Sequence, residues 1–205
     1  EEARGIRAAV WRAVAVPRLA RDLFLHGGLG AWLLWLLQTP EGRRDPDSEA
    51  FAMRLFEMLL QHEGIRQRAT EGDRFPEYRL AVAAVAGRAA AGPGGPGHGR
   101  ALAFVARVGR ACAIEGNPSF CQGAVAPARL AGLLQRALRW PGAGDGQLLA
   151  DAADAGMALL PAGPPEDDSG GAGGTDAHWR VVRAVIACAL RAFGSGASPR
   201  GPPPP

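Results

Sequence analysis

Three observations predict an all-α protein. Apolar residues recur at the three- and four-residue spacing of helix faces along most of the 205 residues. No segment alternates apolar and polar residues in the way that a half-buried strand does. Turns rich in glycine and proline divide the chain into eight or nine segments of helical length. The chain therefore favours helices packed on helices.

The helix boundaries follow from residues that start or stop helices. Pro17, Pro76 and Pro127 suit the first turn of a helix, where the missing N–H is not needed. Ser48 and Asp176 are N-cap residues, because their side-chain oxygens accept from the first free N–H groups. The predicted helices cover residues 5–16, 18–26, 29–38, 48–69, 76–91, 99–114, 127–140, 147–160 and 177–193.

The apolar stripes of these helices predict their buried faces. The helix over 29–38 is apolar almost all round, so we expect it at the centre, with Trp32 and Leu33 nearly inaccessible. Base stacking on Trp32 and Trp35 is the alternative to core packing. In the last helix the stripe runs through Trp179, Val182, Val185, Ile186, Leu190 and Phe193.

Helices of this length joined by short turns predict an irregular α-solenoid, with helix pairs stacked as in HEAT and armadillo proteins. A compact helical bundle is the alternative, because no regular repeat motif is visible. We expect one helical-repeat domain over residues 1–194, with flexible loops at about 92–98 and 161–175. Residues 195–205 form a Pro-rich tail that we expect to be disordered, at the C-terminal end of a larger protein.

Charged residues are unevenly distributed along the chain, but the exclusive use of arginine as the basic residue has a simple explanation. All 23 basic residues are arginine, which is typical of a GC-rich coding sequence, and the net charge is only +3. No basic residue lies between Arg139 and Arg180, whereas seven acidic residues do. We interpret the Asp151 and Asp154 pair in this stretch as an exposed acidic helix face.

Catalytic, cofactor-binding and metal-binding motifs are not recognisable. His62-Glu63 resembles the start of a zinc-protease helix, but position 66, where the second histidine would stand, is Arg66. The glycine-rich loop over 92–99 lacks the Lys-Ser or Lys-Thr of a phosphate-binding loop. We therefore expect no enzyme activity, no cofactor, no metal and no small-molecule substrate.

Cysteine usage and hydropathy bear on the compartment. Cys112, Cys121 and Cys188 follow no disulfide or metal spacing, which makes an intracellular location the default. The most apolar run, over 23–37, is too short and too interrupted by glycine to span a bilayer. We expect no contact with a membrane.

Residues 20–37 (ARDLFLHGGLGAWLLWLL) resemble a helix–glycine–helix element of the nucleolar pre-ribosomal-associated protein 1 family. In that element a helix ends in a polar residue and glycine, followed by leucine, two variable residues and Trp-Leu. The second glycine, Gly28, departs from this pattern. The resemblance implies the C-terminal region of a very long nucleolar α-solenoid that helps to assemble the precursor of the large ribosomal subunit. It implies pre-ribosomal proteins as partners and assigns no functional residue.

Ribosomal RNA is a further candidate partner. Two predicted helices carry arginines at the same seven-then-three spacing, which places each row on one side of its helix. These residues are Arg100, Arg107 and Arg110, and Arg129, Arg136 and Arg139. We expect the two rows to adjoin if the helices stack, and the planar guanidinium suits phosphate. The alternative is that these arginines simply fill solvated helix faces. A protein-docking adaptor unrelated to ribosomes is the alternative function.

Overall fold

The computed structural model describes residues 2–42, 46–70, 76–92, 96–139, 146–161, 163 and 172–195. These residues form ten α-helices and one short 3-10 helix, η1, with no strand among them. The elements are α1 (Glu2–Val14), α2 (Pro17–Leu25), α3 (Leu29–Gln38), α4 (Pro46–Leu59), α5 (Glu63–Thr70), α6 (Pro76–Ala91), α7 (Pro96–Ile114), η1 (Pro118–Cys121), α8 (Pro127–Arg139), α9 (Gly146–Leu159) and α10 (Ala172–Gly194). The all-α prediction is confirmed.

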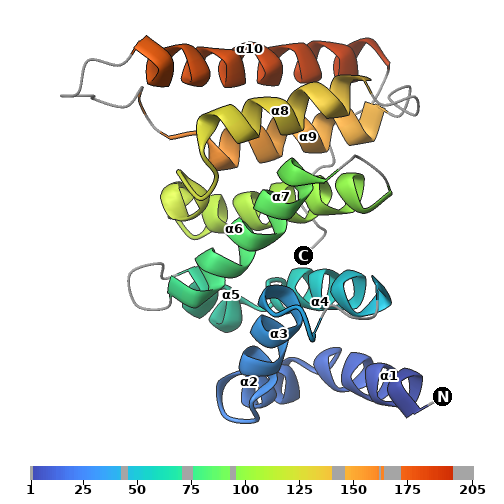
Figure 1. The fold of residues 1–205 in the computed structure, drawn as a ribbon. Coiled ribbons are helices and arrows are strands. Elements are labelled where there is room, and N and C mark those ends of the chain that lie inside the picture. Colours follow the sequence, from blue (N-terminus) through green and yellow to red (C-terminus); the bar gives the residue numbers. More distant parts are fainter. Residues whose placement is uncertain are drawn as a thin grey trace.

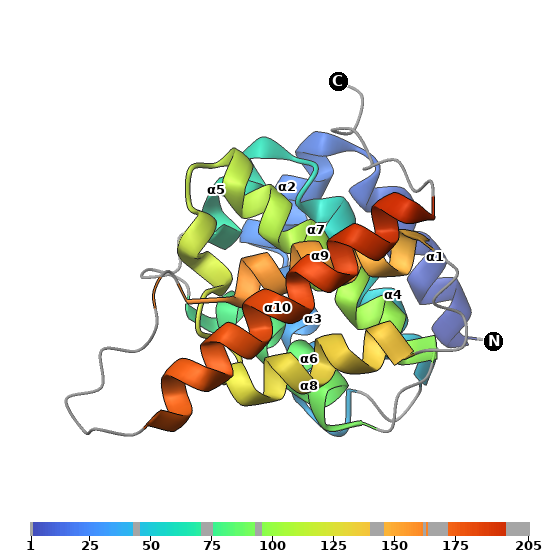
Figure 2. The same ribbon diagram turned by 90° about the horizontal axis from the view of Figure 1, so that it is seen from above.

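The helices are layered in chain order along one direction (Figure 1). α1 and α2 lie at one end, α3 to α7 lie in the middle, and α8 and α9 lie beneath α10 at the other end. α10 is the last described helix, and seen from above it runs across the other helices (Figure 2). This order is compatible both with an irregular stack of helix pairs and with a compact bundle.

Prolines and glycines set most of the boundaries, as the sequence indicated. Proline is the first residue of five α-helices, α2, α4, α6, α7 and α8. Gly28 adopts a left-handed conformation, with φ of 73°, between α2 and α3.

Several boundaries differ from the predicted ones, and the N-cap predictions were wrong, because Ser48 lies inside α4 and Asp176 inside α10. The helix expected over 48–69 is two helices, α4 and α5, separated at residues 60–62. α7 begins at Pro96, inside the loop expected at 92–98, and α10 begins at Ala172, inside the loop expected at 161–175. The rest of those loops lies largely outside the described residues, and so does the tail from residue 196.

An aromatic chain joins the middle layers. Tyr78 of α6 stacks on Phe24 of α2 and on Phe56 of α4, with ring centroids 5.5 and 5.8 Å apart. Phe56 also contacts Phe104 of α7 at 5.9 Å. These pairs bury large apolar surfaces that come from four helices, so they tie α2, α4, α6 and α7 together. Burial raises the pKa of Tyr78 to about 12.

α3 is central, but not on every side. Leu33 is fully buried, as predicted, whereas Trp32 is only half-buried and meets the edge of Phe51 at 6.1 Å. Trp35 is 44% exposed. The expectation of a nearly inaccessible Trp32 was therefore wrong, because the neighbours of α3 are α2, α4 and α6, which leave one of its sides open. No helix among the described residues has both the length and the apolar character needed to cross a membrane.

Candidate functional site

The six arginines proposed for RNA contact divide into two groups. Arg100, Arg129 and Arg139 are exposed, whereas Arg107, Arg110 and Arg136 are half-buried and bind other parts of the chain. Arg136 donates to the backbone carbonyls of Ala90 and Gly92, with 3.0 Å to Gly92, so it closes the end of α6. RNA contact by the six residues stays a prediction.

Two of the internal arginines lead from α7 to different neighbours. Arg107 pairs with Glu57 of α4, and Arg110 pairs with Asp154 of α9. α7 packs mainly against α9, and α8 mainly against α10. The arginines of α7 therefore join its own neighbours rather than forming a common row with those of α8.

A polar seam thus runs between α4, α7 and α9, made by Glu57, Arg107, Arg110, Asp151 and Asp154. Asp151 is only 4% exposed; it accepts from Nε2 of Gln147 at 3.1 Å and lies 3.6 Å from the Arg110 guanidinium. The expectation of an exposed acidic face was therefore wrong for Asp151. Its partner Arg110 is 41 residues earlier, so helical spacing within α9 could not reveal it.

Burial dominates the electrostatics of this seam. It raises the pKa of Glu57, although the Arg107 guanidinium opposes the rise, and Asp151 adds to it. Burial likewise raises the pKa of Asp154 against the attraction of Arg110. Each carboxylate has a cation beside it, so the arrangement is that of a structural ion-pair network between helices.

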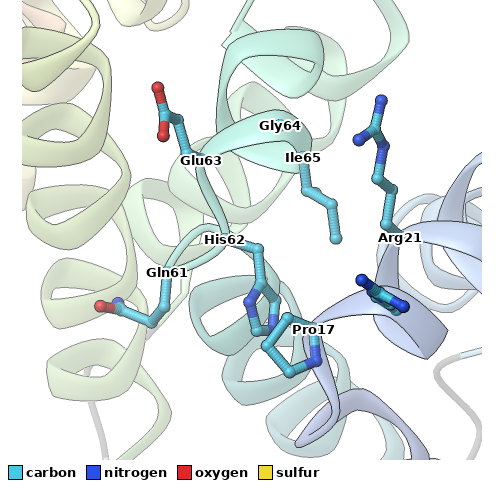
Figure 3. Close-up of a pocket in the computed structure, with 8 residues that line it drawn as sticks. Pro17, Arg21, Gln61, His62, Glu63, Gly64 and Ile65 are labelled. Atoms are coloured by element: carbon cyan, nitrogen blue, oxygen red, sulfur yellow. The ribbon is translucent and has the colours of Figure 1, made fainter.

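A hollow of about 350 Å³ lies between the start of α2 and the corner that joins α4 to α5 (Figure 3). Its lining residues are Pro17, Arg18, Arg21, Gln61, His62, Glu63, Gly64 and Ile65. Nε2 of His62 donates to the carbonyl of Val14 at 3.1 Å, because a carbonyl only accepts. The imidazole therefore anchors the corner to the end of α1.

The chemistry of this hollow is limited. The side chains of Arg21 and Glu63 extend along opposite sides of it in Figure 3, so a positive and a negative group flank it. Arg66, which stands where a zinc-protease helix needs its second histidine, pairs with Glu115, the residue after α7. Within the described ranges, no three His, Cys, Asp or Glu side chains gather as a metal site.

The three cysteines are all buried thiols. A hydrogen bond with Cys121 and burial raise the pKa of Cys112. Burial raises the pKa of Cys188 to about 11. A thiol with a raised pKa is a poor nucleophile, so Cys112 and Cys188 serve packing.

The most unusual surface is the outward side of α10. Trp179 and Ile186 are half exposed, Leu190 is 68% exposed and Phe193 is 82% exposed. We call these four side chains the outer face of α10. No described helix covers this side, which is the uppermost in Figure 1 and faces the viewer in Figure 2. Clustered large apolar side chains at a surface mark an interaction site.

Four residues of the stripe that was predicted to be buried therefore face outward. They are Trp179, Ile186, Leu190 and Phe193. The buried face consists of smaller side chains, Val181, Ala184, Val185, Cys188 and Ala192. α9 approaches α10 so closely that a Cβ on Gly156 would lie 2.5 Å from Cγ2 of Val185. Large side chains do not fit this contact and point outward. The sequence did indicate an exposed apolar side, since α10 carries apolar residues on two opposite sides. A surface helix needs only one apolar side to pack on its core.

A second exposed apolar group lies at the opposite end, on α1 and α2 and the turn between them. It consists of Ile6, Trp11, Val16 and Leu19. Trp11 is partly covered by Phe51, with centroids 6.2 Å apart. This group is less exposed than the outer face of α10, which is therefore the stronger candidate for an interaction site.

Comparison of the chain with protein-family models, with curated proteins and with solved structures gives no match.

Proposed function

We propose that this chain is a non-catalytic scaffold segment that docks a partner protein, and that it assists assembly of the large ribosomal subunit precursor in the nucleolus. The outer face of α10 carries the docking role. Four large apolar side chains there are half or more exposed, whereas the carboxylates of Glu57, Asp151 and Asp154 are paired within the fold. A surface of this kind gains free energy when a partner covers it.

The ribosomal part of the proposal is supported by the resemblance of residues 20–37. That segment forms two helices, α2 and α3, with Gly28 at positive φ between them. A helix–glycine–helix element is what the resemblance implies. The proposed partners are pre-ribosomal proteins, and the exposed Arg100, Arg129 and Arg139 are the proposed contacts to ribosomal RNA.

The alternative is a helical adaptor that binds a partner protein outside ribosome assembly. The outer face of α10 supports this alternative equally, so cellular location separates the two. Under the first proposal, the tagged chain concentrates in nucleoli and sediments with precursors of the large subunit. A diffuse cytoplasmic signal with no such sedimentation would reject the ribosomal role and leave the adaptor.

A variant tests whether the outer face is the docking surface. Leu190→Ser with Phe193→Ser removes two exposed side chains, so the fold and its thermal midpoint should be unchanged. We expect loss of co-sedimentation with the precursor particles. The matched control is Leu80→Ser, which removes an equally exposed leucine from α6. Equal retention of both variants would exclude α10 as the docking surface.

A further inference from the structure

We propose that the outer face of α10 binds an amphipathic α-helix of the partner, one with an apolar seam and a row of carboxylates along one flank. This inference rests on the docking role proposed above and specifies the chemistry of the partner. It follows from the spacing of the exposed apolar residues, from the contrast between the two sides of α10 and from the position of its arginines.

The spacing is that of a helix-packing seam. Trp179, Ile186 and Phe193 recur every seven residues, and Val182 and Ala189 lie between them at the alternating three- and four-residue steps. Apolar residues at this heptad spacing pack against a second helix that crosses at a shallow angle. From Trp179 to Phe193 the seam is about 21 Å long at 1.5 Å per residue. That length matches about four turns of a partner helix.

The two sides of α10 have different roles. Small side chains on the inner side allow close packing on α8 and α9, as the Gly156 contact shows. The large side chains occupy the outer side, where Phe193 belongs to the seam and Leu190 lies beside it. Bulky side chains that project from one helix fill the holes between side chains of a facing helix. The outer side is therefore shaped to enter a partner rather than to face water.

The arginines of α10 fix the charge of that partner. Arg183 lies beside the seam and Arg180 lies further round the same flank, whereas Arg191 lies nearly opposite the seam, and Asp176 is the single acidic residue between positions 172 and 195. Arg180 pairs with Asp176, and Arg183 lies 3.7 Å from the same carboxylate. Arg191 donates to the carbonyl of Leu138 at 2.8 Å. Two exposed guanidiniums thus share one carboxylate, which leaves an excess positive charge beside the seam.

These surface pairs do not prevent docking. An exposed ion pair contributes roughly 0–1 kcal/mol, so incoming carboxylates can replace Asp176 at small cost. Glutamates along the facing flank of a partner helix would neutralise the excess charge and fix the helix orientation. The charge complement therefore selects an acidic helix.

A second copy of the chain is a poorer occupant. In a two-fold symmetric antiparallel pair of helices, each flank faces the same flank of the other copy. The flank that carries Arg180 and Arg183 would then face the same positively charged flank of the other copy, and like charges oppose that pairing. An anionic membrane is also poorer, since Arg180 and Arg183 lie on one flank only, and a helix that lies in a membrane surface has basic residues on both sides of a broader apolar face.

The experiment uses the full chain and two synthetic 21-residue helical peptides with leucine at the seam positions. One peptide carries glutamate and the other lysine at the flanking positions. Binding is followed by fluorescence anisotropy over a salt series. We expect the glutamate peptide to bind at least about tenfold more tightly than the lysine peptide, with a preference that shrinks as salt rises.

Three variants locate the interaction. Ile186→Ser should abolish binding, and Arg180→Glu with Arg183→Glu should reverse the preference between the peptides. Leu80→Ser on α6 should bind as the unaltered chain does. Circular dichroism verifies that each variant is folded. Equal affinity for the two peptides, or an Ile186→Ser variant that binds normally, overturns the proposal.

The other occupants give separate outcomes. A concentration-dependent dimer that Ile186→Ser abolishes, without peptide binding, would make a second copy the occupant. The chain could instead bind phosphatidylserine vesicles but not the peptides, with Ile186→Ser abolishing the vesicle binding. That result would make a membrane the occupant of the outer face of α10. Both results overturn the acidic-helix proposal. Failure of the ribosomal role appears independently, as absence from nucleoli of a chain that still binds the glutamate peptide.

Discussion

Glu57 is the residue at which burial and charge pairing oppose each other most directly. Its carboxylate pairs with Arg107, yet burial still raises its pKa above the ordinary 4.5. The cost of burying the charge therefore exceeds what Arg107 returns. Because the folded state holds the proton more tightly, Glu57 reduces stability as the pH rises from about 4.5 through the raised pKa.

Substitution of each partner should separate these effects. We expect Glu57→Gln to leave the free energy of unfolding at pH 7 unchanged or to increase it, because a neutral amide replaces a buried charge. Arg107→Gln should cost about 1–3 kcal/mol, since it leaves the carboxylate without its partner. Urea unfolding between pH 4.5 and 8 measures the free energy of unfolding of both variants. As the pH rises, the Glu57→Gln variant should lose less stability than the unaltered chain. If Glu57→Gln lowered the free energy of unfolding at pH 7 as much as Arg107→Gln does, the ion pair would contribute more stability than burial of the carboxylate costs.

His98 should give the opposite dependence on pH. Its imidazole is buried near Arg136, and burial lowers its pKa below the ordinary 6.5. Folding therefore favours the neutral form, and stability falls as the pH drops from about 6.5 through the lowered pKa. We expect His98→Leu to flatten this part of the curve of unfolding free energy against pH. An unchanged slope between pH 6.5 and 5 in the variant would contradict the assignment.

At the scale of helices, glycines decide how closely neighbours approach. Gly156 lies where α9 meets α10, and an added Cβ would be 2.5 Å from Val185 and 3.1 Å from Leu134. Gly132 of α8 has no such neighbour within 4 Å. Alanine favours a helix over glycine by about 1 kcal/mol. We therefore expect Gly132→Ala to raise the thermal midpoint and Gly156→Ala to lower it, because the clash of about 1–3 kcal/mol exceeds the helix gain. A Gly156→Ala variant as stable as Gly132→Ala would show that the helices can separate freely.

Helix positions could be predicted well because their signals are local. Pro17, Pro76 and Pro127 begin helices, as predicted, and the helix over 29–38 has the predicted bounds. The division of 48–69 was missed because α4 ends without a proline or glycine at the break. Boundaries without such residues depend on packing, which a single sequence does not show.

The faces of the helices could be predicted less well, because they depend on neighbours distant in the sequence. Asp151 is buried since Arg110 reaches it from α7. Trp32 is partly open because its neighbours leave one side of α3 uncovered. Phe193 points outward since the contact of α9 with α10 admits only small side chains. The candidate docking surface was therefore not predicted, although its residues were named as an apolar stripe.

At the scale of the whole molecule, helix packing is uneven along the stack. The closest packing in the described chain joins α9 to α10, α7 to α9 and α8 to α10. α3 contacts α2, α4 and α6. Its contact with α6 also depends on a glycine, since a Cβ on Gly30 would lie 2.6 Å from the hydroxyl of Tyr78. Gly30 belongs to α3 and Gly156 to α9, and these two helices lie in different layers (Figure 1).

These two glycines can distinguish a solenoid from a compact bundle. In a solenoid each unit depends on its neighbours, so a local defect unfolds locally, whereas a small bundle unfolds as one unit. The close packing of α7 to α10 leads us to expect local behaviour. Gly156→Ala should speed amide hydrogen exchange in α8, α9 and α10, and Gly30→Ala should speed it in α2, α3 and α6. Exchange measured by mass spectrometry on peptides from each helix checks this, with Gly132→Ala as the control that should slow exchange in α8. If either alanine speeds exchange equally in all helices, the chain unfolds as a single bundle, because only a fully cooperative fold carries a defect in one layer to all the others.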